Sequence, residues 1–115
     1  MGYVKNIIIG SNTAHLIEPI LYTTCNTGAE IAEKTALIDN FELVSGVTIQ
    51  VRFLYENTSA SPTLNISNTG AKTIYLYNDN LSPWNSGEVV SLTYDGTGSG
   101  AWYINNYNKV EVIRL

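Results

Sequence analysis

The side chains best suited to chemistry in this chain are aromatic rings interleaved with amides and a carboxylate. The aromatic residues are Trp84, Tyr75, Tyr77, Tyr103 and Tyr107, and the polar residues near them are Asn78, Asp79, Asn80 and Asn85. An exposed aromatic ring can pack against the apolar face of a pyranose, while neighbouring polar side chains bind its hydroxyls. The predicted sugar-binding residues are therefore Trp84, Tyr75, Tyr77, Asn78, Asp79 and Asn85.

The same aromatic residues also have a structural interpretation. Trp84 could plug one end of a barrel, and the tyrosines could cover sheet faces or pack between subunits. For Trp84 the sequence favours this burial. For Tyr75 and Tyr77 both interpretations stay open, because Ile74 and Leu76 alternate with them and already supply a buried face.

Patterns for catalysis or metal binding are weak. A single His15 and a single Cys25 cannot supply a zinc site, which draws several such ligands. The acidic residues lack calcium-loop spacing, and nothing singles out a carboxylate pair for glycoside hydrolysis. The glycine-rich segment 95–100 lacks the lysine and helix of a phosphate loop, which favours a hairpin connection. We therefore expect no catalytic residue, no metal and no cofactor.

The hydrophobic pattern that must position these residues is one of short strands. In Val47–Tyr55 apolar side chains alternate with polar ones, which is the period of a strand with one buried face. A polar run ending at Pro62 interrupts the pattern. Thr63–Ile66 then resumes it with Leu64 and Ile66 on one face. This stretch predicts a long strand, a polar connection and a short return strand.

Similar segments occur along the chain. The other expected extended segments are Tyr3–Ile9, Ile20–Thr24, Lys34–Ile38, Phe41–Val44, Thr73–Tyr77, Glu88–Tyr94, Ala101–Asn105 and Val110–Leu115. The one modest helix signal, near residues 28–34, covers at most two turns, and an irregular connection is the alternative. No helix is long enough to cross between parallel strands. We therefore expect an all-β fold, either a small antiparallel β-sandwich or a partly closed barrel.

Composition narrows the class of protein. A chain of 115 residues can form one domain with a sizeable core. Charged residues make up only 14%, against roughly 25% in typical soluble domains, which suits an extracellular or particle-borne β-protein. The net charge of −4 and the scattered basic residues disfavour nucleic-acid binding. The apolar run near the N-terminus is too short for a signal sequence or a membrane span.

Four stretches between Thr24 and Ile104 carry a recognisable set of motifs. They are Thr24-Cys25-Asn26-Thr27; the strand from Gly46 to Arg52-Phe53 with Asn57-Thr58 and Ser61-Pro62-Thr63-Leu64-Asn65-Ile66; Asn68-Thr69-Gly70-Ala71-Lys72 with Ile74-Tyr75; and Val90 to Tyr94-Asp95-Gly96-Thr97 with Trp102-Tyr103. Together they resemble a small β module of bacteriophage virion proteins, found in tail fibres, head fibres and receptor-binding proteins. The block from Ser61 to Lys72 is the most specific part.

The resemblance implies a structural and adhesive role on the virion surface, without catalytic residues. It favours a head-fibre, capsid-decoration or tail-fibre subunit that contacts other capsid or tail proteins and forms a homo-oligomer, with a trimer preferred. A host-surface glycan is the implied ligand, and neither nucleic acid nor membrane insertion is expected. Two alternatives remain: a purely structural capsid- or tail-stabilising subunit that binds no ligand, and a stand-alone lectin-like carbohydrate-binding module.

Apolar segments at the two ends lie outside the matched motifs. We expect residues 1–20 to form an anchoring or subunit-contact segment and residues 21–115 to form the β module. The expected subunit or virion contacts are Tyr3, Ile7, Ile8, Ile9, Ile113 and Leu115. The alternative is that both ends add strands to the same sheet.

Overall fold

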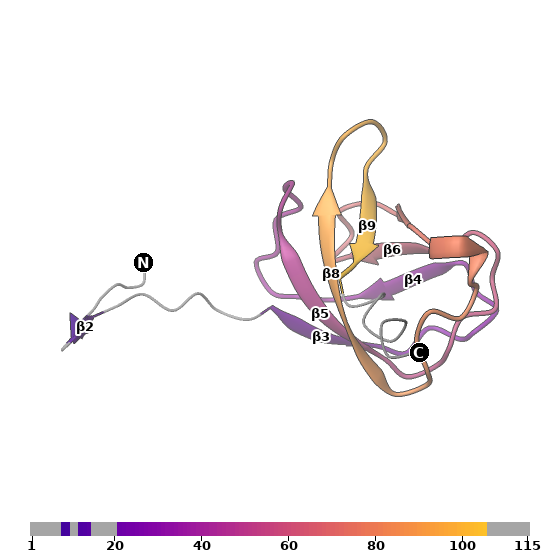
Figure 1. The fold of residues 1–115 in the computed structure, drawn as a ribbon, viewed down its shortest axis with the longest axis horizontal. Coiled ribbons are helices and arrows are strands. Elements are labelled where there is room, and N and C mark those ends of the chain that lie inside the picture. The colour runs from indigo at the N-terminus through magenta and orange to yellow at the C-terminus, as the bar shows by residue number, and fades with distance from the viewer. Residues whose placement is uncertain (1–7, 10–11, 15–20, 106–115) are drawn as a thin grey trace, which may run out of the picture.

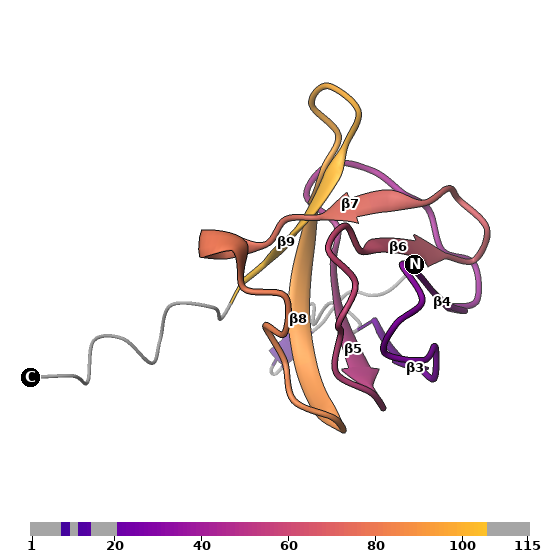
Figure 2. The same ribbon diagram turned by 90° about the vertical axis from the view of Figure 1, so that its right-hand side faces the viewer.

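The main body of the protein is one seven-stranded sheet that curls into a nearly closed barrel (Figures 1 and 2). This computed structural model describes residues 8–9, 12–14 and 21–105. The barrel strands are β3 (Tyr22–Cys25), β4 (Glu33–Ala36), β5 (Thr48–Phe53), β6 (Thr63–Ile66), β7 (Lys72–Ile74), β8 (Glu88–Asp95) and β9 (Ala101–Ile104). Their order across the sheet is β3-β5-β8-β9-β7-β6-β4. The expectation of an all-β, partly closed barrel is confirmed.

Near the N-terminus, two short strands pair with each other. β1 (Ile8–Ile9) and β2 (Asn12–Ala14) form an antiparallel two-stranded ladder. The other residues for which we expect subunit or virion contacts, Tyr3, Ile7, Ile113 and Leu115, lie outside the described part of the chain, as does Tyr107. The side chains of Ile8 and Ile9 lie outside it as well.

The segment around residues 28–34 is not helical. The Ile31 N–H donates to the Gly28 carbonyl at 3.2 Å in a tight turn, and strand β4 begins at Glu33. The irregular connection is therefore the correct interpretation, because pairing of β4 with β6 outweighs a weak local helix propensity. Within the described residues the single helical element is the 3-10 turn η1 (Tyr77–Asp79). No described helix is long and apolar enough to cross a membrane.

The strand pairing is mixed rather than purely antiparallel. β3 pairs in parallel with β5, β4 with β6, and β7 with β9, whereas the other three pairs of the barrel are antiparallel. Parallel neighbours need a long crossover connection, which is usually a helix. Here the crossover connections contain other strands of the same barrel instead of a helix. β4 lies in the connection from β3 to β5, and β8 lies in the connection from β7 to β9.

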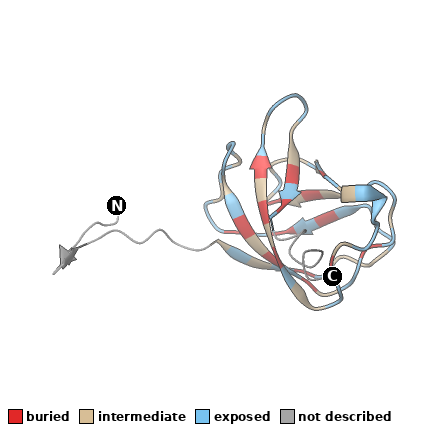
Figure 3. Cartoon of the chain, in the orientation of Figure 1, coloured by how far each residue is buried: buried red, intermediate tan, exposed pale blue. Residues whose placement is uncertain are grey.

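The core follows from side-chain alternation along each strand (Figure 3). In β5, Ile49, Val51 and Phe53 are buried, whereas the alternating residues Thr48 and Arg52 are exposed and Gln50 is half-buried. The same alternation buries one face of β8 and of β9. Each fully buried aliphatic or Phe side chain contributes about 1.5–3 kcal/mol to folding, so the inner faces of the strands hold the barrel together.

The polar segment after β5 is a structured connection rather than a hairpin turn, because β5 and β6 are not neighbours in the sheet. Asn57 is fully buried there. Its Nδ2 donates to the Ser59 carbonyl at 2.8 Å and to the Leu81 carbonyl at 2.7 Å, and its Oδ1 accepts the Ser59 N–H at 3.1 Å. This buried amide, with its hydrogen bonds satisfied, therefore holds the connection after β5 against the segment around Leu81.

Side chains, rather than a backbone ladder, bridge the gap between the two edge strands β3 and β4. The Thr23 hydroxyl donates to the Leu37 carbonyl at 2.7 Å. The Thr27 hydroxyl accepts the Thr35 N–H at 3.1 Å. We call this gap the seam of the barrel.

The hairpin that joins β8 to β9 rises beyond the other strands and packs on Tyr94 (Figures 1 and 2). Gly100 has a φ of +85°, and a Cβ at this position would overlap the Tyr94 hydroxyl. Gly98 in the same hairpin has a φ of +65°, but a Cβ there would meet nothing within 4 Å. A substitution at Gly98 would therefore cause backbone strain alone, whereas the same substitution at Gly100 would cause both backbone strain and steric overlap.

We expect Gly100→Ala to lower the free energy of unfolding by about 2–4 kcal/mol, because left-handed strain adds to the overlap with Tyr94. Gly98→Ala is the matched control and should cost about 1 kcal/mol, from strain alone. Urea denaturation of both variants measures the difference. Equal losses would show that the contact between Gly100 and Tyr94 does not limit substitution.

Candidate functional site

Three tyrosines gather on the outer face of the barrel. β7 and β9 are parallel, with Ile74 opposite Trp102, so the residues that follow them, Tyr75 and Tyr103, come side by side. Their ring centroids are 5.4 Å apart. Tyr77, in η1, meets Tyr75 edge-on at 4.9 Å. We call these three residues the tyrosine cluster.

The tyrosine cluster faces outward because its neighbours face inward. Ile74 and Trp102 are each 1% exposed, whereas Tyr75 is 46% and Tyr103 is 36% exposed. Tyr75 is held by its backbone, since its N–H donates to the Trp102 carbonyl at 2.9 Å. The sheet thus presents aromatic surface to solvent on a fixed backbone.

The turn after Tyr77 carries two residues in the left-handed region. Asn78 has a φ of 56° and Asp79 a φ of 58°. Asn and Asp adopt this region more readily than other residues with a Cβ. The Asn80 N–H closes the turn on the Tyr77 carbonyl at 3.0 Å. This geometry fixes the backbone that carries the Asp79 side chain.

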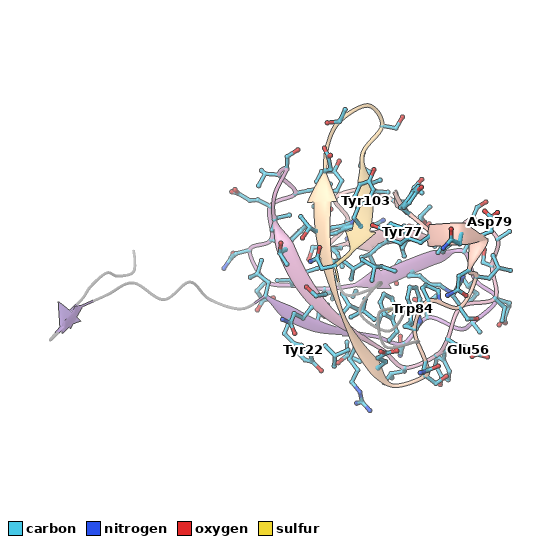
Figure 4. All side chains as sticks on the ribbon, viewed as in Figure 1. Tyr22, Glu56, Tyr77, Asp79, Trp84 and Tyr103 are labelled. Atoms are coloured by element: carbon cyan, nitrogen blue, oxygen red, sulfur yellow. The ribbon has the colours of Figure 1, made fainter. Side chains whose placement is uncertain are left out.

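A hollow of about 290 Å³ adjoins the tyrosine cluster. Its lining residues are Ala60, Ser61, Pro62, Thr63, Thr73, Ile74, Tyr75, Leu76 and Asp79. Figure 4 shows Tyr77, Tyr103 and Asp79 in the same region of the barrel. Aromatic surface, hydroxyl-bearing side chains and a carboxylate therefore meet at one site, which is an arrangement suited to binding a sugar.

Trp84 belongs to the core and not to this exposed surface. It is 1% exposed, and its ring stacks on Phe53 with centroids 3.9 Å apart. Its Nε1–H donates to the Tyr55 carbonyl at 3.0 Å. The faces of the indole are therefore not available to a sugar, and of the two interpretations of Trp84 the structure supports burial. Asn85 belongs to the turn before β8, where its N–H donates to Glu88 at 2.7 Å.

We expect Trp84→Ala to destabilise the protein by about 3–5 kcal/mol, because removal of a stacked, buried indole leaves a cavity. Tyr22→Ala is the control; Tyr22 is 51% exposed, and its loss should change the free energy of unfolding by less than about 0.5 kcal/mol. Chemical denaturation measures both. A Trp84→Ala protein as stable as the parent would contradict a core role.

The basic side chains of the described residues are occupied away from the tyrosine cluster. Lys34 is 1% exposed, and its Nζ donates to the carbonyls of Gly28 and Ala29, each at 3.1 Å. Burial lowers the pKa of the Lys34 amine, and nearby Cys25 and Glu30 partly oppose that shift.

The other two described basic residues also bind carbonyls. Arg52 Nε donates to the Gly87 carbonyl at 3.1 Å, beside the start of β8. Lys72 Nζ donates to the Ser99 carbonyl at 3.4 Å, in the hairpin. None of the three lines the hollow at Asp79.

A larger hollow of about 690 Å³ follows the seam. Its lining residues are Thr23, Thr24, Asn26, Thr35, Ala36, Leu37, Leu54, Asn65 and Asn68. They offer hydroxyl and amide groups but no aromatic ring and no charge. No local sequence pattern indicates this hollow, because its two walls come from the strands β3 and β4, which approach each other only when the sheet curls into a barrel. Within the described residues no group of three or more His, Cys, Asp or Glu side chains could hold a metal ion.

Comparison of the chain with protein-family models, with curated proteins and with solved structures finds no match.

Proposed function

We propose that this chain is a non-catalytic adhesive module that binds surface glycans through the tyrosine cluster. The observation that carries this proposal is the packing of exposed Tyr75 and Tyr103 with half-buried Tyr77 beside a hollow that Asp79 lines. We further propose that the module is an accessory protein of a bacteriophage virion, in a head fibre, a capsid decoration or a tail fibre. The motif block from Ser61 to Lys72 and the low charge content support this setting.

The proposed mechanism combines stacking with hydrogen bonding. The C–H groups of a pyranose pack on the Tyr75 and Tyr103 rings, and the Asp79 carboxylate accepts hydrogen bonds from sugar hydroxyls. Each such contact contributes only about 0.5–1.5 kcal/mol, so one site binds weakly. A homo-oligomer, for which a trimer is our expectation, and many copies on one particle raise the overall avidity without any new contact.

A purely structural role in a capsid or tail is the second candidate. The observation that favours it is an apolar side chain in solvent at the seam, since Leu37 is 73% exposed. Leu37 directly follows the edge strand β4, which has no ladder to the other edge strand β3, and an open sheet edge can pair with another chain.

We expect Tyr75→Ser and Tyr103→Ser each to weaken glycan binding about tenfold, because each removes an aromatic contact of the proposed site. Both residues are exposed, so the fold should persist, and a thermal melt checks this. Tyr22→Ser is the matched control, because Tyr22 is also exposed but lies in a different region of the barrel from Tyr103 (Figure 4). A glycan array followed by interferometry with the purified protein measures binding.

Unchanged binding in both cluster variants would refute the proposed site. A blank array combined with tight binding to intact particles would favour the structural role instead.

A further inference from the structure

We propose that the tyrosine cluster selects uncharged glycans and rejects acidic ones, such as sialylated or sulfated sugars, with Asp79 as the residue that determines this specificity. This inference rests on the proposed function, because it assigns a ligand class to the same site. It goes further by naming the charge that the ligand must have.

The hollow beside the tyrosine cluster carries a single charged side chain. Asp79 lines it together with Tyr75, and the other lining side chains are uncharged. A sugar stacked on the cluster would therefore place its substituents near one negative group. A carboxylate or sulfate on that sugar would be repelled by Asp79, whereas a hydroxyl could donate a hydrogen bond to it.

No described basic side chain lines the hollow. Acidic sugars are usually held by Arg or Lys, which neutralise and hydrogen-bond the anion. In residues 21–105 these side chains are Lys34, Arg52 and Lys72, and each donates to backbone carbonyls elsewhere. An anionic ligand would thus find a repelling group at the cluster and no compensating cation among the described side chains.

Asp79 lies in a turn of defined backbone geometry. Its backbone is held at a φ of 58°, in a turn that the Asn80 N–H closes on Tyr77. The backbone therefore fixes the position from which the Asp79 side chain projects, and this side chain lines the hollow beside Tyr75. Its negative charge acts on each ligand that stacks there. Asn also tolerates this backbone conformation, so the charge can be removed with little change of shape.

The test compares pairs of oligosaccharides that differ only in a terminal sialic acid or a sulfate, presented to the full chain on an array and by interferometry. We expect the parent to bind the uncharged member at least tenfold more tightly, and this affinity ratio should decrease as salt screens the repulsion. In Asp79→Asn the affinity ratio should fall to about threefold or less. In Asp79→Lys it should reverse.

The matched control is Glu56→Gln. Glu56 is an exposed acid that lies apart from Tyr77, Tyr103 and Asp79 (Figure 4). This variant removes the same charge and should keep the preference of the parent. A thermal melt of each variant confirms that the fold is intact.

The outcomes separate the two proposals. If the parent binds acidic sugars as tightly as uncharged ones, and Tyr75→Ser weakens that binding about tenfold, the proposed function stands and the selectivity is overturned. The selectivity is also overturned if Asp79→Asn leaves the affinity ratio between uncharged and acidic sugars unchanged. If the parent binds no glycan at all, both proposals fail.

Discussion

Pairing on both sides of β5 is the constraint on which the rest of the structure depends. β5 pairs in parallel with β3 and antiparallel with β8, and its inward residues Ile49, Val51 and Phe53 form the centre of the core. Phe53 also stacks on Trp84, which places the segment between η1 and β8 against the barrel. Because β8 in turn pairs with β9, and β9 with β7, the strands that carry the tyrosine cluster are joined to β5 by a continuous series of ladders.

The candidate site exists because of one parallel register. Tyr75 and Tyr103 are distant in sequence, but each follows a residue of the paired positions Ile74 and Trp102. The two outward rings must then be neighbours, since successive side chains alternate between faces. Aromatic surface on a paired backbone loses little conformational entropy when a ligand binds, which suits a site whose individual contacts are weak.

The sequence predicted local features well and distant pairings poorly. Alternation correctly placed β5, β6 and the β8–β9 hairpin, with Trp102 and Ile104 facing inward, because those signals lie within a few residues. The parallel pairs were not predictable, because their crossovers are strands rather than helices. The contact between Tyr75 and Tyr103 and the hollow at the seam depend on these same long-range pairings, so periodicity alone could not reveal them.

The edge position of β3 has a mechanical consequence. Its backbone ladder to β5 is parallel and runs the length of β3, whereas only side chains such as Thr23 tie the neighbourhood of β3 to the far edge of the barrel. A pull applied at Leu21 along the strand axis therefore loads the ladder to β5 in shear. In this geometry the hydrogen bonds of the ladder share the load and break together. A pull perpendicular to the strand would break them one at a time and would therefore need less force.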